Sequence, residues 1–167
     1  MLAGVLGPDK GKIEVGHQVF ISYFPQNHTE IIDKKETKTS FDWLKERRPG
    51  IYDQDVRSVM GKMLFGGDDA FKPIGTLSGG ETARLIMAGM LLSDHNLLIL
   101  DEPNNHLDLE AVSALGWGLS EYKGTVIVAS HDRDLIDNVA TKIIAFEENG
   151  IQLFDGPLEQ YLASKKG

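Results

Sequence analysis

The chain has 167 residues, enough for about one domain with a substantial core, and a formal net charge of −8. This negative charge argues against non-specific binding to nucleic acid or to acidic membranes, although Lys45, Arg47 and Arg48 form a local basic cluster. Cysteine is absent, which excludes disulfides and thiolate chemistry. No apolar run approaches the roughly 20 residues of a membrane span, and the first residues lack a signal-peptide pattern. We therefore expect a cytoplasmic protein without membrane insertion.

The segment GPDKGKI at residues 7–13 resembles a phosphate-binding loop but does not meet its requirements. A P-loop has a glycine, four residues, then Gly-Lys and Ser or Thr, because backbone N–H groups, the lysine and the hydroxyl each contact phosphate or Mg²⁺. Here three residues separate Gly7 from Gly11, Ile13 stands at the hydroxyl position, and Pro8 has no N–H to donate. Gly61-Lys62 also lacks the leading glycine and the hydroxyl. The sequence therefore contains no P-loop.

The N-terminal half of the sequence predicts one strand and two helices. Residues 18–23 alternate and are rich in strand-forming residues, and the polar residues 27–39 indicate a loop. Residues 41–48 predict a helix that stops at Pro49-Gly50. Residues 53–64 predict another, with apolar residues at helical spacing.

The C-terminal half predicts buried strands that alternate with helices. The expected helices are 77–92, 108–119 with Asp108 as N-cap, a helix from Asp132 to about residue 139, and 157–164. The apolar runs 97–100 and 125–129 predict strands buried on both faces. Asn149-Gly150 predicts a hairpin turn between residues 142–146 and 151–154. This alternation predicts a parallel α/β sheet, and the helices between residues 40 and 75 interrupt it as an inserted subdomain.

The pentapeptide LSGGE at residues 77–81 has two alternative roles. Ser78 and Glu81 have the spacing of a capping box, which starts a helix. The segment also places glycines and free N–H groups at a helix N-terminus, where a phosphate can bind. Gly79 and Gly80 would let the backbone approach the anion closely, and Ser78 would add a hydroxyl. The pentapeptide alone leaves both roles open.

Ionisable side chains follow the two predicted buried strands. Asp101 and Glu102 end the first strand, at the edge where α/β sheets bind ligands. Asp101 could hold Mg²⁺ and Glu102 could polarise an attacking water, or both could belong to a solvated turn. His131 could contact a terminal phosphate or could be structural. Gln26 has only an amide to offer and indicates almost nothing by itself.

Taken together, these motifs resemble those of an ATP-binding-cassette ATPase. LSGGE, LLILDE at 97–102, NNHLD at 104–108 and SHD at 130–132 follow the order of the family's signature, Walker B, D-loop and H-switch. Gln26 falls where the family's Q-loop glutamine belongs. Glu81 in place of Gln, the NHLD segment and the ending FDGP at 154–157 resemble the ABC-F subfamily, soluble tandem-cassette proteins that often act on the ribosome. Asn104 departs from the Thr that is usual there.

The resemblance implies a P-loop NTPase-type parallel sheet and the ligands ATP and Mg²⁺. Residues 1–39 and 76–167 would form the ATPase core, and about 40–75 the helical subdomain. At this cassette's own nucleotide, Asp101 and Gln26 would bind Mg²⁺, Glu102 would act as general base, and His131 would contact the γ-phosphate.

The resemblance also implies a second cassette as partner, in the same parent chain or in a homodimer. Ser78, Gly79 and Gly80 would contact the partner cassette's ATP. The residues expected at the cassette–cassette interface are Asn105, His106 and Asp108. The ribosome is a candidate further partner.

The resemblance begins downstream of the family's P-loop, so we expect a partial cassette that lacks the N-terminal strand and binds ATP weakly by itself. Its incomplete sheet is expected to expose apolar surface that favours pairing with another chain. Two alternatives remain open. The parent could be the ATPase subunit of a membrane transporter, or this module could pair with another cassette without hydrolysing ATP.

Overall fold

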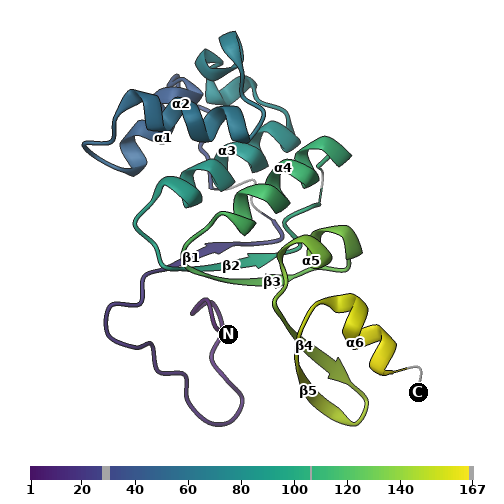
Figure 1. Ribbon diagram of the computed structural model, residues 1–167. Helices are drawn as coiled ribbons and strands as arrows, with labels where there is room; N and C mark the ends of the chain where they lie inside the picture. Colours follow the sequence, from purple (N-terminus) through teal and green to yellow (C-terminus); the bar gives the residue numbers. More distant parts are fainter. Residues whose placement is uncertain (28–30, 106, 166–167) are drawn as a thin grey trace.

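A three-stranded parallel sheet lies at the centre of the computed structural model, which describes residues 1–27, 31–105 and 107–165 (Figure 1). Its strands, in the order β1-β2-β3, are β1 (Ile21–Phe24), β2 (Leu97–Asp101) and β3 (Thr125–Ala129). Both neighbouring pairs are parallel. The predicted parallel α/β sheet is confirmed.

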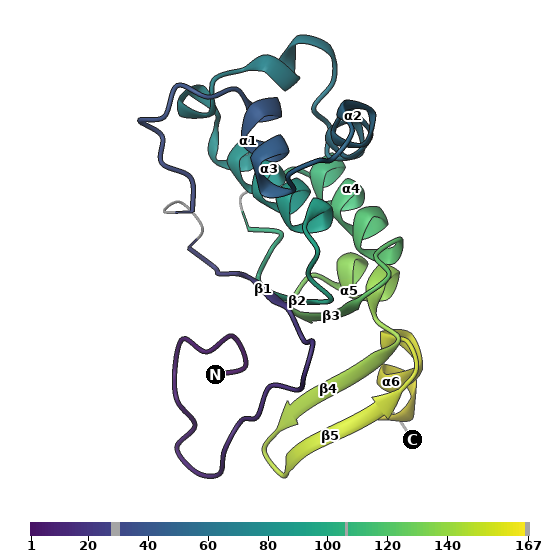
Figure 2. The same ribbon diagram turned by 90° about the vertical axis from the view of Figure 1, so that its left-hand side faces the viewer.

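Two layers of helices are stacked on one face of this sheet (Figures 1 and 2). The layer next to the sheet contains α3 (Gly79–Leu92), α4 (Leu109–Ser120) and α5 (Arg133–Val139). The outer layer contains α1 (Ser40–Arg47), α2 (Asp53–Lys62) and the 3₁₀ turns η1 (Gly67–Phe71) and η2 (Ile74–Thr76). A separate antiparallel hairpin of β4 (Lys142–Glu147) and β5 (Gly150–Asp155) packs on α6 (Leu158–Ser164).

Helix α3 is the centre of the hydrophobic core because it lies between the outer helices and the sheet. Its side chains are buried on almost every side, in contrast to the single apolar stripe of a surface helix. Leu44 of α1 and Met60 of α2 are fully buried in the same cluster, as is Leu98 of β2. Each such burial contributes roughly 1.5–3 kcal/mol of transfer free energy.

Strand β1 begins later than the sequence predicts. The alternating pattern starts at Gln18, but backbone pairing with β2 runs from Ile21 to Phe24. Before that point the Asn96 side chain supplements the backbone bonds, because it accepts from the Phe20 N–H at 2.9 Å and donates to the Gln18 carbonyl at 2.7 Å, while the Phe20 carbonyl still accepts from the Leu97 N–H at 3.2 Å. The helix boundaries, in contrast, lie within about two residues of their predicted positions.

The prediction that residues 125–129 are buried on both faces is wrong. Thr125 and Ala129 are exposed, and the residues between them are half-buried. The reason is that β3 pairs with β2 alone, and within the described chain no helix covers the sheet face opposite α3, α4 and α5 in either view (Figures 1 and 2). An apolar edge strand of this kind can accept further pairing.

One face of the β4–β5 hairpin is apolar and exposed. Ile144 lies opposite Leu153 and Phe146 lies opposite Ile151, so the four side chains share a face. They are 54%, 79%, 82% and 65% exposed, respectively. The other face packs on α6, where the rings of Phe154 and Tyr161 are 5.7 Å apart.

The basic cluster recognised in the sequence is engaged within the chain. Lys45 and Arg48 form ion pairs with Asp53 and Asp94, and Arg47 stacks on an indole ring. Within the described ranges, no helix is both long enough and apolar enough to span a bilayer.

We predict that the chain self-associates through the exposed hairpin face, because contiguous apolar patches on soluble proteins are usually covered. Substituting Phe146→Lys and Leu153→Lys together should lower the average mass measured by static light scattering. Tyr52→Lys is the matched control, since Tyr52 is 78% exposed at the start of α2, in the outer helical layer. A monomeric wild-type chain at high concentration would contradict this prediction.

Candidate functional site

The three parallel strands bring the predicted catalytic residues to one edge of the sheet. Phe24 pairs with Leu100, and Asp101 pairs with Ala129, so the carboxyl ends of all three strands are level. The residues at this edge are Gln26 after β1, Asp101 and Glu102 at the end of β2, and His131 after β3. In open α/β sheets this edge is where ligands bind.

Asp101 lies next to a tyrosine that the sequence did not single out. The Tyr23 hydroxyl donates to Asp101 Oδ2 at 3.4 Å, across the β1–β2 pair. Burial raises the pKa of Tyr23, and the negative charge of Asp101 raises it further. A tyrosine that becomes buried usually needs a partner for its hydroxyl, but the alternating pattern of residues 18–23 did not indicate which residue that partner would be.

The chemistry of Asp101 fits a magnesium ligand. Across the residues that the structure describes, no group of three His, Asp or Glu side chains could hold a metal by itself. Mg²⁺ is typically bound through one or two carboxylates, with nucleotide phosphates and waters supplying the other ligands. Asp101 can therefore be the protein ligand of a nucleotide-bound ion. Gln26, the other predicted ligand, is exposed on the loop just after β1.

Glu102 has an unusual backbone conformation. Its φ is +48°, in the left-handed region that costs a non-glycine residue free energy. Its N–H donates to the Ala129 carbonyl at 2.8 Å, which continues the β2–β3 pairing by one residue. The strained turn directs the Glu102 carboxylate toward His131, whose Nδ1 lies 2.9 Å from Oε2.

The Glu102 carboxylate raises the pKa of His131, chiefly through their hydrogen bond and then through its negative charge. The imidazolium form is therefore favoured over a wider pH range than in free histidine. In that form both ring nitrogens carry a proton, so Nε2 can donate to an anion while Nδ1 stays in the ion pair with Glu102 Oε2.

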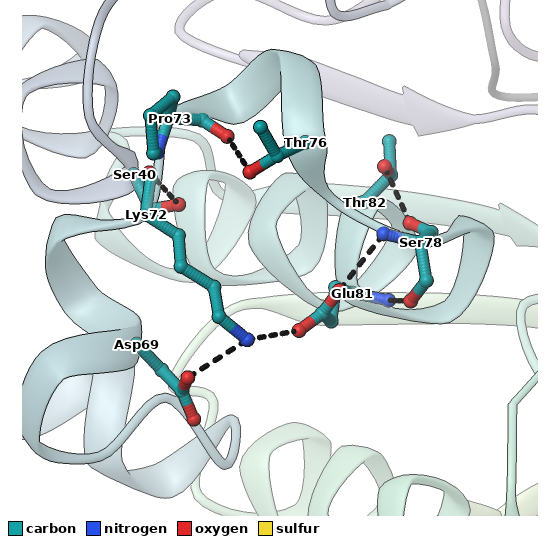
Figure 3. A network of polar contacts seen from close by, with 8 residues as sticks. All are labelled: Ser40, Asp69, Lys72, Pro73, Thr76, Ser78, Glu81 and Thr82. Carbon is teal, nitrogen blue, oxygen red and sulfur yellow. Dashed lines mark hydrogen bonds and ion pairs between the residues drawn. The ribbon is translucent and has the colours of Figure 1, made fainter.

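The signature segment forms the capping box that its spacing predicts (Figure 3). Ser78 Oγ accepts from the Glu81 N–H at 3.2 Å, and Glu81 Oε2 accepts from the Ser78 N–H at 2.8 Å. Gly79 is exposed, and a Cβ added to it would have no atom within 4 Å. The backbone at Gly79, the first residue of α3, is thus open to close approach, and Gly80 follows it in the first turn.

A lysine from the outer helical layer holds Glu81 in place (Figure 3). Lys72 Nζ lies 3.0 Å from Glu81 Oε1 and 2.8 Å from Asp69 Oδ1. The Ser78 N–H is the main cause that lowers the pKa of Glu81 to about 2, and Lys72 adds to it. The Lys72 carbonyl also accepts from the N–H and hydroxyl of Ser40, so the same residue contacts the start of α1. No sequence pattern indicated this lysine.

The predicted loop after Gln26 supports the other side of the signature turn. Lys34 Nζ donates to the Leu77 carbonyl at 2.9 Å, and the Ile74 N–H donates to the Lys38 carbonyl at 3.0 Å. A Cβ on Gly75 would lie 2.5 Å from the Lys34 carbonyl oxygen, so this close approach requires glycine. The signature turn is therefore fixed from two directions.

The D-loop residues connect the sheet edge to α4. The Asn105 N–H donates to the Glu102 carbonyl at 3.1 Å, and Asp108 caps α4 by accepting from the Ala111 N–H at 2.8 Å. His106 lies outside the described residues. Among the residues the structure does describe, no hydrogen bond or ion pair joins the signature segment to Asp101, Glu102 or His131. The predicted site residues thus form two separate groups.

We predict that Glu81→Gln lowers stability near neutral pH and has little effect near pH 2. A carboxyl whose folded pKa is depressed contributes stability above its unfolded pKa, near 4.5, and loses it as pH falls toward about 2. The difference between 4.5 and about 2 corresponds to about 3 kcal/mol, and the measured effect should be smaller because water screens this carboxylate, whose side chain is 21% exposed. Chemical unfolding at pH 6 and pH 2 measures the difference. Glu110→Gln, in the first turn of α4, is the control, and an equal effect at both pH values would refute the assignment.

We predict that Glu102→Gln lowers the pKa of His131 toward the ordinary histidine value of about 6.5. Because the folded pKa is raised, the pair's contribution to stability is complete below the unfolded pKa and disappears as pH rises through the folded value. NMR titration of the His131 ring in the wild-type and variant chains checks this. An unchanged titration curve would show that Glu102 is not the cause.

Comparison with known proteins identifies the family. The family profile described as "ABC transporter" matches residues 1–105. The chain is 38% identical over 164 residues to the ATP-binding protein YdiF of Bacillus subtilis, covering 98% of this chain and 25% of YdiF. It is 40% identical over 154 residues to the ATP-binding protein Uup of Haemophilus influenzae, covering 90% of this chain and 23% of Uup. It is 34% identical over 163 residues to human ATP-binding cassette sub-family F member 3, covering 98% of this chain and 23% of that protein. The chain spans about a quarter of the length of these relatives.

Solved structures share the fold. An archaeal ribosome recycling factor, aABCE1, in complex with the ribosomal stalk protein aP1 aligns with a TM-score of 0.70 and 27% identity, over 98% of this chain and 33% of that one. A metal-chelate type ABC transporter in an inward-facing conformation aligns with a TM-score of 0.63 and 21% identity, over 92% of this chain and 64% of that one. This likeness supports the fold alone. The sheet is thus of the P-loop NTPase type. The chain belongs to the ATP-binding-cassette family, and its relatives are of the ABC-F type.

Proposed function

We propose that this chain supplies one part of an ATP-binding and hydrolysis site in an ABC-F-type protein. The observation that carries the proposal is the pairing of Glu102 with His131 at 2.9 Å, next to Asp101, at the carboxyl edge of a parallel sheet. The relative Uup, which is named as an ATP-binding protein, supports ATP as the ligand.

Glu102 is the proposed general base. Its side chain is 22% exposed, so the carboxylate is accessible to a water molecule while remaining partly shielded from bulk solvent. Oε2 is engaged by His131, which leaves Oε1 to accept a proton from the attacking water. His131, 78% exposed, donates from Nε2 to a γ-phosphate oxygen. Since phosphoryl transfer depends on positioning and charge stabilisation, one such pair serves both needs.

Asp101 is the proposed protein ligand of Mg²⁺, with Gln26 contributing its amide oxygen from the loop after β1. When bound, the ion neutralises charge on the terminal phosphates. The Tyr23 hydroxyl contacts Asp101 Oδ2 and in this proposal helps to orient the carboxylate.

The signature residues serve a different nucleotide in this proposal. Ser78, Gly79 and Gly80 form an accessible helix N-terminus, which attracts anions, but the hydrogen bonds of this segment lead to the outer helices rather than to Glu102. We therefore assign them to the ATP of a second cassette, with Asn105, His106 and Asp108 at the interface. In this division residues 1–39 and 76–167 form the ATPase core and residues 40–75 the helical subdomain.

The parent protein is proposed to act in the cytoplasm with the ribosome as a partner. Support comes from the likeness to aABCE1, which is named as an archaeal ribosome recycling factor and was solved with a ribosomal stalk protein. The net charge of −8 argues against non-specific attachment of this part of the protein to RNA.

The proposed hydrolysis is tested by restoring a P-loop. We expect this chain alone to bind Mg²⁺–ATP weakly in calorimetry, because the main phosphate contacts of the family lie in a P-loop that its sequence lacks. A chimera with the P-loop segment of Uup joined upstream should hydrolyse ATP. Glu102→Gln in the chimera should reduce kcat at least 100-fold, the scale of general-base catalysis.

Glu121→Gln in the same chimera is the matched control, since this exposed carboxylate lies at the C-terminal end of α4, the opposite end from Asp108. A chimera that binds ATP and a second cassette but hydrolyses nothing would contradict the hydrolase proposal and favour a pairing module. Tight Mg²⁺–ATP binding by the chain alone would contradict the expected dependence on a P-loop.

A further inference from the structure

We propose that Ser130 and Asn104 are positioning residues that keep Glu102 and His131 in register. This inference rests on the proposed hydrolytic function of that pair. Neither residue has a direct part in the chemistry assigned above, and Asn104 stands where the subfamily usually has another residue. The two side chains nevertheless join the turn after β2 to the turn after β3.

A single side-chain hydrogen bond makes this connection. Ser130 Oγ donates to Asn104 Oδ1 at 2.9 Å, in partly buried surroundings. The same hydroxyl oxygen accepts from the Asp132 N–H at 3.1 Å. The hydroxyl therefore links both sequence neighbours of His131, since Ser130 carries it and Asp132 donates to it. Through Asn104 the same hydroxyl is also bonded to the turn after β2.

The bond closes a small ring around Glu102. The Glu102 N–H donates to the Ala129 carbonyl at 2.8 Å, and Ala129 is followed directly by Ser130. From Glu102 the chain continues through Pro103, which is buried, to Asn104. The ring thus runs from Glu102 through Asn104 and Ser130 to Ala129 and back, and its two cross-strand links are the backbone bond and the Asn104–Ser130 bond.

Glu102 and His131 each have a property that makes such a ring necessary. The left-handed backbone at Glu102 persists only where neighbouring contacts hold it. The His131 side chain is 78% exposed, so packing does little to fix its position relative to Oε2. The Ser130–Asn104 bond constrains both Glu102 and His131, because it joins the turn that follows Glu102 to the residue just before His131.

Amide hydrogen exchange of the chain itself tests the ring without ATP. Ser130→Ala and Asn104→Ala should each speed exchange of the Glu102 N–H by roughly 2- to 10-fold, the effect of losing one neutral hydrogen bond. The Asp132 N–H should respond more to Ser130→Ala, which removes its acceptor, than to Asn104→Ala. Ser130→Thr keeps the hydroxyl and should restore slow exchange.

A double variant shows whether the two substitutions remove one shared hydrogen bond or cause two independent defects. If Ser130 and Asn104 act through one bond, the double alanine variant should exchange at Glu102 no faster than either single variant. Ser113→Ala is the matched control, because its hydroxyl makes a comparable bond to the Leu109 carbonyl on exposed α4. Additive effects, or unchanged Glu102 exchange in both single variants, would overturn the inference.

Steady-state kinetics in the Uup chimera then tests the link to catalysis. Ser130→Ala should lower kcat by roughly 3- to 30-fold with little change in KM for ATP, since misplacing the base weakens the transition state rather than nucleotide binding. Faster exchange with unchanged kcat would overturn the positioning role while leaving hydrolysis intact. An inactive wild-type chimera would refute the proposed function instead, and the exchange data would still decide whether the ring exists.

Discussion

Pairing of β2 on both of its edges is the constraint on which the remaining arrangement depends. The strand is held by β1 on one side and β3 on the other, and its central residues Leu98 to Leu100 are buried. A parallel strand in this position cannot shift by one residue without reversing which side chains face the core. Asp101 and Glu102 are therefore located at the sheet edge by the same contacts that hold the fold together.

The signature segment depends on a different set of contacts. Its turn is braced by Lys72 from the outer helices and by Lys34 from the loop after β1, and α3 then runs through the core. A displacement of the outer helices is thus transmitted to Ser78 more directly than to Glu102. If the two groups serve different nucleotides, their relative position can respond to a partner while each group stays internally fixed.

Local patterns in the sequence were enough to predict the elements and most candidate residues. The capping box at Ser78 follows from a spacing of three residues, and β2 follows from a continuous apolar run. Contacts between distant segments could not be predicted, because they depend on how elements pack: Tyr23 with Asp101 is one example and Lys34 with Leu77 another. The exposure of β3 was missed for the same reason, since an apolar run does not reveal whether a strand has one neighbour or two.

The positive φ of Glu102 lowers the stability of the fold, whereas the proposed chemistry needs the carboxylate of the same residue. Glycine adopts this conformation without steric cost, and asparagine tolerates it better than glutamate does. A substitution there could make the fold about 1 kcal/mol more stable while it removes the carboxylate. Any procedure that improves this protein by stability alone would therefore tend to erase the candidate base first, and position 102 would have to be held fixed during such engineering.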